Sequence, residues 1–209
     1  LRMNKYFYSF ISFFRFVDKF RLEKQINVYR NGEIKFKVMD MGKVTRARAN
    51  TFEKKEPETI NWIESFEQGD KFLDIGSNIG IYSLFAASRN HQTIAIEPDA
   101  LNYALLNLNI RNNNLSNLIT AYCIAIHNET KFAKFNISSY AWGGALNSFD
   151  NNLDFTGAEF KPVHNQGLFG MTLDEFLNSI NFIPSHIKID VDGNENFILE
   201  GSKKTLKSA

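Results

Sequence analysis

The sequence predicts an α/β fold in which a parallel β-sheet carries helices on both faces. Two observations lead to this prediction. From residue 71 onward, short apolar segments with strand character alternate with longer segments of helical periodicity. Two of the apolar segments also end in glycine or acidic residues, at the place where open α/β sheets bind ligands. The 209 residues are enough for one domain with a short appendage.

The composition is that of an ordinary globular protein, with 44% hydrophobic and 22% charged residues. Lys and Arg number 24 against 23 Asp and Glu, a net charge of +1, so we expect no nucleic-acid partner. No apolar run reaches the ~18 residues that a membrane-spanning helix needs. Cys123 is the only cysteine, which excludes an internal disulfide and fits a cytoplasmic protein.

Residues 1–25 are predicted to form a separate N-terminal segment, helical over residues 5–22. Polar residues recur at spacings of three and four and leave a wide aromatic face. Six basic side chains against two acidic ones give the segment a charge of +4. Such a helix suits the surface of an anionic membrane. Packing on the domain or on a second copy of the chain is favoured over peripheral membrane binding, because apolar helix faces usually mark protein contacts.

Residues 26–209 are predicted to form one domain. The domain begins with a predicted β-hairpin, in which apolar residues alternate from Ile26 to Val38 around the turn at Asn31 and Gly32. A helix with Pro57 in its first turn follows.

The remaining elements follow from periodicity and capping signals. Thr172 to Glu175 form a capping box, and Asn194 precedes the last helical segment. Residues 138–167 have no clean period and are predicted to be a long loop, of the kind that often closes over a site. The predicted strands are 72–75, 93–97, 117–126 with an extension at 131–137, and 187–190; the predicted helices are 79–88, 99–111, one from 172 and one from 194.

A glycine-containing turn follows the first strand of the predicted sheet. Gly76 permits a tight turn and close approach of a ligand to the backbone. Asn78 tolerates a left-handed conformation, and Gly80 lets the next helix lie close to the strand. The predicted cofactor-binding residues of this turn are Asp74, Gly76, Ser77, Asn78 and Gly80.

An acidic residue ends the second strand, 21 residues after Gly76, in the pair Glu97 and Pro98. A carboxylate there can accept hydrogen bonds from both hydroxyls of a ribose. Dinucleotide sites favour G-x-G-x-x-G, whereas this turn is G-x-x-x-G, and Asp74 beside it would repel a pyrophosphate. Asp74 could pair instead with the amino group of a methionine moiety. The pattern therefore favours a Rossmann-like domain that binds S-adenosylmethionine over one that binds NAD.

With these motifs in place, the sequence resembles the FkbM family of methyltransferases. The matching segments are 55–59, 74–80, 97–99, Asn109, 172–174 and 188–193, within a resemblance that runs from about residue 27 to the end. The resemblance implies transfer of a methyl group from S-adenosylmethionine to an oxygen, often on sugars, polysaccharides or macrolides. The family usually has Glu where this chain has Asp192, and it continues with a fifth strand and an antiparallel hairpin, so we expect a domain that is incomplete at its C-terminus.

The catalytic residues are expected at the end of the fourth strand. A hydroxyl is a poor nucleophile until its proton is removed or a metal lowers its pKa. Asp190 and Asp192 would share one side of an extended chain, as a base and its orienter or as ligands of Mg²⁺. Lys188 is the third candidate, as a partner of Asp190. For Asp192 a helix cap at Asp192 to Glu195 is an equally good explanation.

Other residues carry weaker signals. The four histidines show no metal-ligand spacing and are expected on the surface or in loops. Trp142, in the long loop, suits stacking on a sugar ring or simple packing.

The functional prediction is O-methylation of a small-molecule or glycan hydroxyl. The alternatives are a non-catalytic cofactor-binding domain and a nicotinamide-dependent oxidoreductase. The second lacks its G-x-G-x-x-G fingerprint, and a nucleic-acid methyltransferase would end the fourth strand in a Pro-Pro-aromatic motif that is absent here.

Overall fold

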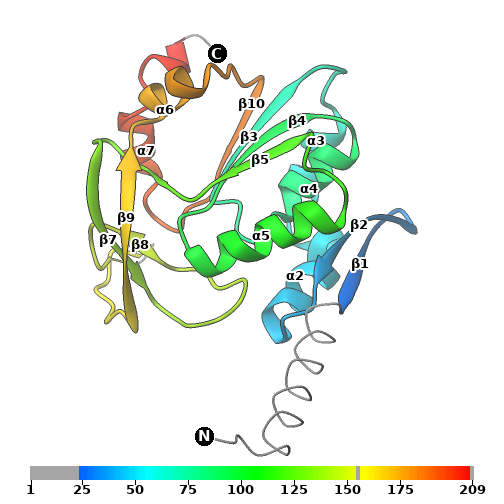
Figure 1. The fold of residues 1–209 in the computed structure, drawn as a ribbon, viewed down its shortest axis with the longest axis horizontal. Coiled ribbons are helices and arrows are strands. Elements are labelled where there is room, and N and C mark those ends of the chain that lie inside the picture. The colour runs from blue at the N-terminus through cyan, green and yellow to red at the C-terminus, as the bar shows by residue number, and fades with distance from the viewer. Residues whose placement is uncertain (1–23, 154–155, 208–209) are drawn as a thin grey trace, which may run out of the picture.

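A computed structural model of the chain describes residues 24–153 and 156–207 (Figure 1). Within these residues the strands form a hairpin, a parallel sheet and a second, smaller sheet. The strands are β1 (Gln25–Arg30), β2 (Glu33–Met39), β3 (Lys71–Ile75), β4 (Gln92–Ile96), β5 (Ile119–Tyr122), β6 (Ala125–Ile126), β7 (Lys131–Ile137), β8 (Ser148–Phe149), β9 (His164–Met171) and β10 (His186–Ile189). The helices are α2 (Lys43–Lys55), α3 (Pro57–Glu64), α4 (Ile81–Ser88), α5 (Ala100–Asn112), α6 (Leu173–Ile180) and α7 (Glu195–Glu200), followed by a short 3₁₀ turn, Thr205–Lys207.

The central sheet has the order β10-β3-β4-β5, and all its strand pairs are parallel. Phe72 and Ala95 belong to a core shared with α4 and α5. Leu73 and Ile94, one residue along each strand, belong to a second core shared with α6 and α7. Because successive strand side chains point to opposite faces, the sheet is buried on both sides, which explains its continuous apolar strands. The predicted parallel sheet with helices on both faces is confirmed.

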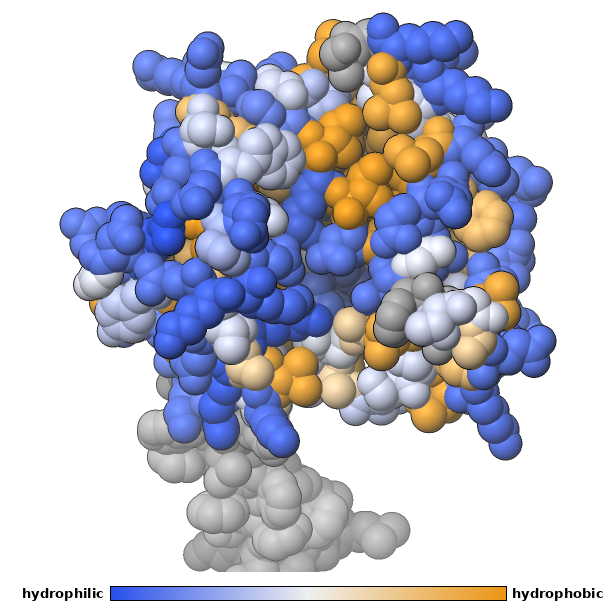
Figure 2. Space-filling view, turned by 180° about the vertical axis from the view of Figure 1, so that it is seen from behind, coloured by the Kyte–Doolittle hydropathy of each residue, from blue (hydrophilic) through white to orange (hydrophobic). Residues whose placement is uncertain are grey.

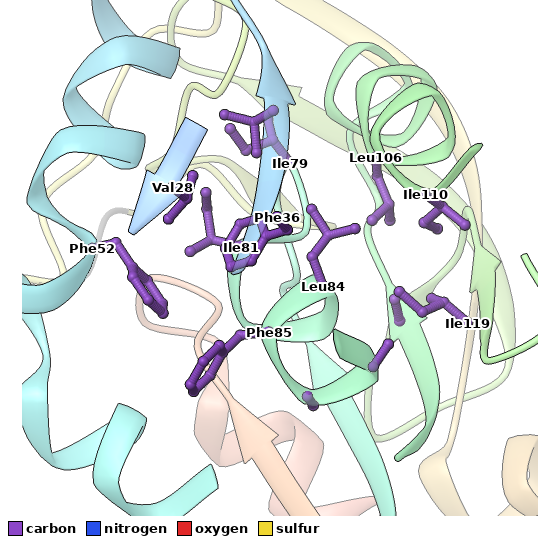
Figure 3. Packing of buried hydrophobic residues seen from close by; sticks show 14 of the residues in the cluster. Val28, Phe36, Phe52, Ile79, Ile81, Leu84, Phe85, Leu106, Ile110 and Ile119 are labelled. Atoms are coloured by element: carbon purple, nitrogen blue, oxygen red, sulfur yellow. The ribbon is translucent and has the colours of Figure 1, made fainter. Parts of the chain in front are cut away.

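The hairpin of β1 and β2 is also confirmed, with positive φ angles of 53° at Asn31 and 79° at Gly32 in its turn. It packs with α2 against α4 and α5, and Val28, Phe36 and Phe52 lie in one cluster with the side chains of those helices (Figure 3). Helix α2 was not predicted from the sequence, although its buried residues recur at helical spacing.

The second sheet corrects two predictions. Strand β7, expected to extend the third strand of the parallel sheet, pairs instead with β9 and β8 in an antiparallel arrangement. The predicted loop at 138–167 contains β8 and the start of β9. Strand β9 lacks an alternating pattern and includes two glycines, so its strand character depends on pairing with β7 across the sheet. In Figure 1 this sheet lies beside the carboxyl ends of the parallel strands.

The C-terminal elements are close to their predicted positions. Thr172 caps α6, where its Oγ accepts a hydrogen bond from the Glu175 backbone N–H at 3.2 Å. Strand β10 pairs with β3 on one side, and its other edge has no strand partner within residues 24–153 and 156–207. Figure 2 shows apolar residues gathered at the end of the molecule that carries the C-terminus. Ile183, just before β10, is 80% exposed.

The predicted N-terminal helix at 5–22 lies outside the described residues. Among the described ones, no helix has both the length and the apolar character needed to cross a membrane.

Candidate active site

The turn after β3 brings two parts of the backbone very close together. The backbone N–H groups of Gly76 and Ser77 both donate to the carbonyl of Ile96, at 2.9 and 3.0 Å. Gly76 has a φ of 82°, and a Cβ built on it would lie 1.9 Å from the carbonyl oxygen of Asp190. Only glycine fits there, so the sequence requires it for the approach of β10 to the turn. Gly80 (φ 88°) plays a packing role, because a Cβ there would meet Leu106 of α5 at 2.4 Å.

Glu97 is a buried carboxylate at the end of β4, facing this turn. It is 5% exposed and accepts hydrogen bonds from the backbone N–H groups of Asn78, at 2.7 Å, and Asp99, at 2.9 Å. Asn78 has a φ of 52°, the left-handed conformation anticipated for it, and this directs its N–H at Glu97. Burial raises the pKa of Glu97 to about 8 despite these two donors.

A cavity that is open to solvent begins at Glu97 and extends toward the second sheet. The space-filling view shows a hollow near the middle of this face of the molecule (Figure 2). Of the predicted site residues, six line this cavity: Gly76, Asn78, Glu97, Pro98, Asp190 and Asp192. Four do not: Asp74, Ser77, Gly80 and Lys188. The walls that the sequence did not indicate include Asn102, His127, Phe135, Asn147, Phe149 and Asn194.

The loop between β7 and β8 forms a roof over the glycine turn. The carbonyl of Gly144 accepts hydrogen bonds from Asn78 Nδ2 at 2.6 Å and Asn102 Nδ2 at 3.0 Å. The backbone N–H of Gly143 donates to Asn102 Oδ1 at 2.8 Å, and its carbonyl accepts from Arg48 Nε at 2.8 Å. The roof is therefore fastened to the turn, to α5 and to α2. Closure over the site by this loop stays a prediction, and Trp142 packs against the core.

Asp74 lies beneath the turn, away from the cavity. It is 1% exposed, and its Oδ2 accepts a hydrogen bond from Ser83 Oγ at 2.6 Å. Its Oδ1 has no hydrogen-bond partner and lies 3.9 Å from Lys188 Nζ. Burial raises the pKa of Asp74, partly offset by Lys188 and Ser83. Direct contact between Asp74 and a ligand in the cavity is not supported by this position.

Lys188 connects the buried Asp74 to the exposed Asp190. Its Nζ lies 2.9 Å from Asp190 Oδ2 and 5.0 Å from the centre of the Tyr82 ring. Burial alone would lower the pKa of Lys188, but the charges of Asp74 and Asp190 outweigh it and the pKa is raised. The predicted pairing of Lys188 with Asp190 is present, and it fixes one oxygen of Asp190 while half of that side chain stays exposed.

Asp192 does not share the environment of Asp190. The strand ends at Ile189, and Asp192 has a φ of 56°, so the extended geometry assumed for the pair does not hold. Asp192 Oδ2 accepts a hydrogen bond from the backbone N–H of Leu146 at 2.7 Å. The predicted helix cap at Asp192 is wrong as well, because Asn194 is the N-cap of α7. Asp192 instead fastens the roof loop to the end of β10.

The predicted magnesium site is not supported. Within residues 24–153 and 156–207, no group of three or more His, Cys, Asp or Glu side chains is placed to bind a metal. Asp190 and Asp192 are the only predicted ligands, and each is bonded to a different partner.

His91 and His127 lie in loops, as expected, but both side chains are buried, with 4% of each exposed. His127 lines the cavity, stacks on Phe197 with ring centres 4.7 Å apart, and has no hydrogen-bond partner at Nδ1. Burial lowers the pKa of His127, which favours the neutral ring at pH 7. The residues next to His127 in the sequence do not indicate that its side chain is buried or that it lines the cavity.

Comparisons with known proteins identify the family of the chain. The model of the methyltransferase FkbM domain matches residues 74–209. A comparison with curated proteins gave no significant match. Among solved structures, an FkbM methyltransferase from Methylobacillus flagellatus KT has a TM-score of 0.45 and 19% identity, over 68% of this chain and 31% of that one. An S-adenosylmethionine-dependent methyltransferase from Agrobacterium tumefaciens has a TM-score of 0.37 and 15% identity, over 49% of this chain and 33% of that one.

The chain thus spans about a third of the length of these solved structures. Their low TM-scores leave the assignment to the family model, which covers well over half of the chain and includes the glycine turn, Glu97 and the end of β10. The chain belongs to the FkbM family of methyltransferases.

Proposed function

We propose that this chain binds S-adenosylmethionine in the cavity above Gly76 and transfers its methyl group to a hydroxyl oxygen of a sugar, polysaccharide or related small molecule. The observation that carries the proposal is the buried carboxylate of Glu97, which lines a cavity beside a turn that only glycine can form. Family membership favours this function over a nicotinamide-dependent one.

The residues present fit this cofactor. Glu97 can accept hydrogen bonds from both ribose hydroxyls, since each carboxylate oxygen takes more than one donor. Asn78 and Asn102 hold the roof over the same region. Apolar walls from Ile96, Ile124 and Phe135 suit a purine. When bound, the cofactor supplies an electrophilic methyl group on a sulfonium.

The chain's own contribution to the reaction centres on Asp190, at the end of β10. Its Oδ2 is held by Lys188, and Asp190 is one of the residues that line the cavity. We assign to the other oxygen, Oδ1, the acceptance of the proton that the acceptor hydroxyl loses as its oxygen bonds to the methyl carbon. The bound cofactor would give up its methyl group with the electron pair of the carbon–sulfur bond remaining on sulfur, and Asp190 would pass the proton to solvent. General-base assistance of this kind contributes about 10²–10⁴ in rate.

The test is Asp190→Asn in the full-length protein, which keeps the size of the side chain. S-adenosylhomocysteine affinity is expected to stay within about threefold of wild type, while turnover falls by about 10²–10⁴. Glu129→Gln, an equivalent change at an exposed residue of the turn between β6 and β7, is the control. Turnover is measured as transfer of radiolabelled methyl groups to fractionated glycans and small molecules.

Wild-type turnover in Asp190→Asn would show that Asp190 is structural. Addition of EDTA separates the metal prediction from direct base catalysis. If EDTA abolishes the wild-type activity and Mg²⁺ restores it, the reaction requires a metal ion. An unchanged rate in EDTA would support direct base catalysis by Asp190.

A further inference from the structure

A second cavity, also lined by Asp190, lies between α2 and the start of α4. It is open to solvent. Its lining consists of Arg48, Thr51, Phe52, Lys55, Glu56, Ile81, Tyr82 and Asp190. Asp190 is the one residue that lines both this cavity and the one above Gly76.

We propose that this second cavity is the acceptor subsite, and that Arg48, Thr51, Lys55 and Tyr82 determine which acceptor enters it. The inference rests on the proposed function. In a displacement at carbon, the attacking oxygen and the departing sulfur lie on opposite sides of the methyl group. Two cavities that meet at one proton-accepting side chain provide this arrangement, with the cofactor in one and the acceptor in the other.

The charged groups of the subsite balance one another. Lys55 Nζ lies 3.3 Å from Glu56 Oε1, and Arg48 Nε donates to the roof carbonyl of Gly143. Lys188 lies between Asp190 and the buried Asp74, so the three cations Arg48, Lys55 and Lys188 face the three acidic residues Glu56, Asp190 and Asp74. A phosphorylated or carboxylated acceptor would find no net positive charge here, so the subsite fits an acceptor without net charge.

The remaining walls combine aromatic surface with hydrogen-bonding groups. Phe52 and Tyr82 both line the cavity, with their ring centres 6.2 Å apart. Burial and a hydrogen bond to Glu56 raise the pKa of Tyr82, so its hydroxyl stays protonated. An apolar floor with a polar rim matches a polyhydroxylated ring, which has an apolar C–H face and a hydroxyl edge.

Arg48 also joins the two sites. Its side chain lines the acceptor cavity, while its Nε bonds to the roof over the glycine turn. Arg48 therefore contacts both the acceptor cavity and the loop over the glycine turn. This makes Arg48 a positioning residue for the cofactor side as well as a wall of the acceptor side.

The experiment uses Thr51→Trp in the full-length protein. Thr51 is exposed at the rim, and its hydroxyl bonds only within α2, to the carbonyl of Ala47 at 2.8 Å. An indole there would occupy part of the cavity. The matched control is Lys54→Trp, the same new side chain at an exposed α2 position that does not line the cavity.

For the acceptor found by methyl labelling, Thr51→Trp is expected to raise the KM at least tenfold and to weaken direct acceptor binding in calorimetry equally. The S-adenosylhomocysteine affinity and the melting temperature should match Lys54→Trp. An unchanged acceptor KM in a folded Thr51→Trp variant would overturn the subsite. A methylated product with net charge at pH 7 would overturn the predicted neutrality. Absence of S-adenosylhomocysteine binding in the wild type would instead refute the proposed function itself.

Discussion

The pKa of Glu97 couples cofactor binding to proton release. Without ligand the carboxyl group has a pKa of about 8, against an ordinary value of 4.5, because it is buried. Two ribose hydroxyls donating to it would stabilise the charged form and lower this value. Binding at pH 7 must then release the proton that about nine-tenths of the free molecules carry, from a pKa of about 8.

The magnitude follows from the same value. If only the ionised form binds, the apparent Kd scales with one plus the ratio of protonated to ionised carboxyl. With a pKa of about 8, the Kd of S-adenosylhomocysteine should rise about 50-fold from pH 8 to pH 6, or about 2.3 kcal/mol. Calorimetric titration in phosphate and in Tris, which differ in ionisation enthalpy, measures the protons released.

Glu97→Gln removes the titrating group. Because its amide NH₂ would face a backbone N–H donor, we expect weaker binding overall, by about 1–3 kcal/mol. The variant should show no pH-dependent release of protons between pH 6 and 8. A wild-type Kd that is constant over this range, or the same pH dependence in Glu97→Gln, would refute the reasoning.

Three further predictions concern stability and assembly. Gly76→Ala should lower the free energy of unfolding by about 2–4 kcal/mol in urea titrations. Gly32 has a similar φ of 79°, but a Cβ there would have nothing within 4 Å, so Gly32→Ala should cost only about 1–2 kcal/mol. Equal costs would contradict the close approach of Gly76 to Asp190. Lys188→Met should lower the free energy of unfolding by about 3–5 kcal/mol, because it leaves Asp74 buried without its cation. The double variant with Asp74→Asn should recover part of this loss. A loss below about 1 kcal/mol in Lys188→Met would contradict the coupling of the two residues. One edge of β10 has no strand partner among the described residues, so the chain should self-associate in light-scattering measurements. Ile183→Lys should reduce self-association more than Phe132→Lys on the second sheet. Equal effects of the two variants would place the contact elsewhere.

The parts of the molecule that could be predicted from the sequence are those with local signals. The hairpin follows from Asn31 and Gly32, and the start of α6 follows from its capping box. The glycine turn and Glu97 follow from their positions at the ends of short apolar strands. Each of these features depends on neighbours within a few residues.

The parts that could not be predicted depend on contacts between distant segments. Strand β9 has no alternation of its own and is ordered by β7, some 30 residues earlier. Asp192 was misassigned because its left-handed conformation ends the extended chain and directs the carboxylate at Leu146. The role of Asn102 could not be predicted, because its side-chain amide bonds to the backbone of Gly143 and Gly144, which lie about 40 residues later in the chain.

The central claim is that the cavity above Gly76 binds S-adenosylmethionine, and native mass spectrometry with added S-adenosylhomocysteine tests it most directly. The account predicts one bound ligand per wild-type chain at pH 8, and less adduct for Glu97→Gln than for Glu129→Gln at the same ligand concentration. Absence of any adduct on a folded wild-type protein at millimolar ligand would contradict it, as would equal occupancy of all three proteins.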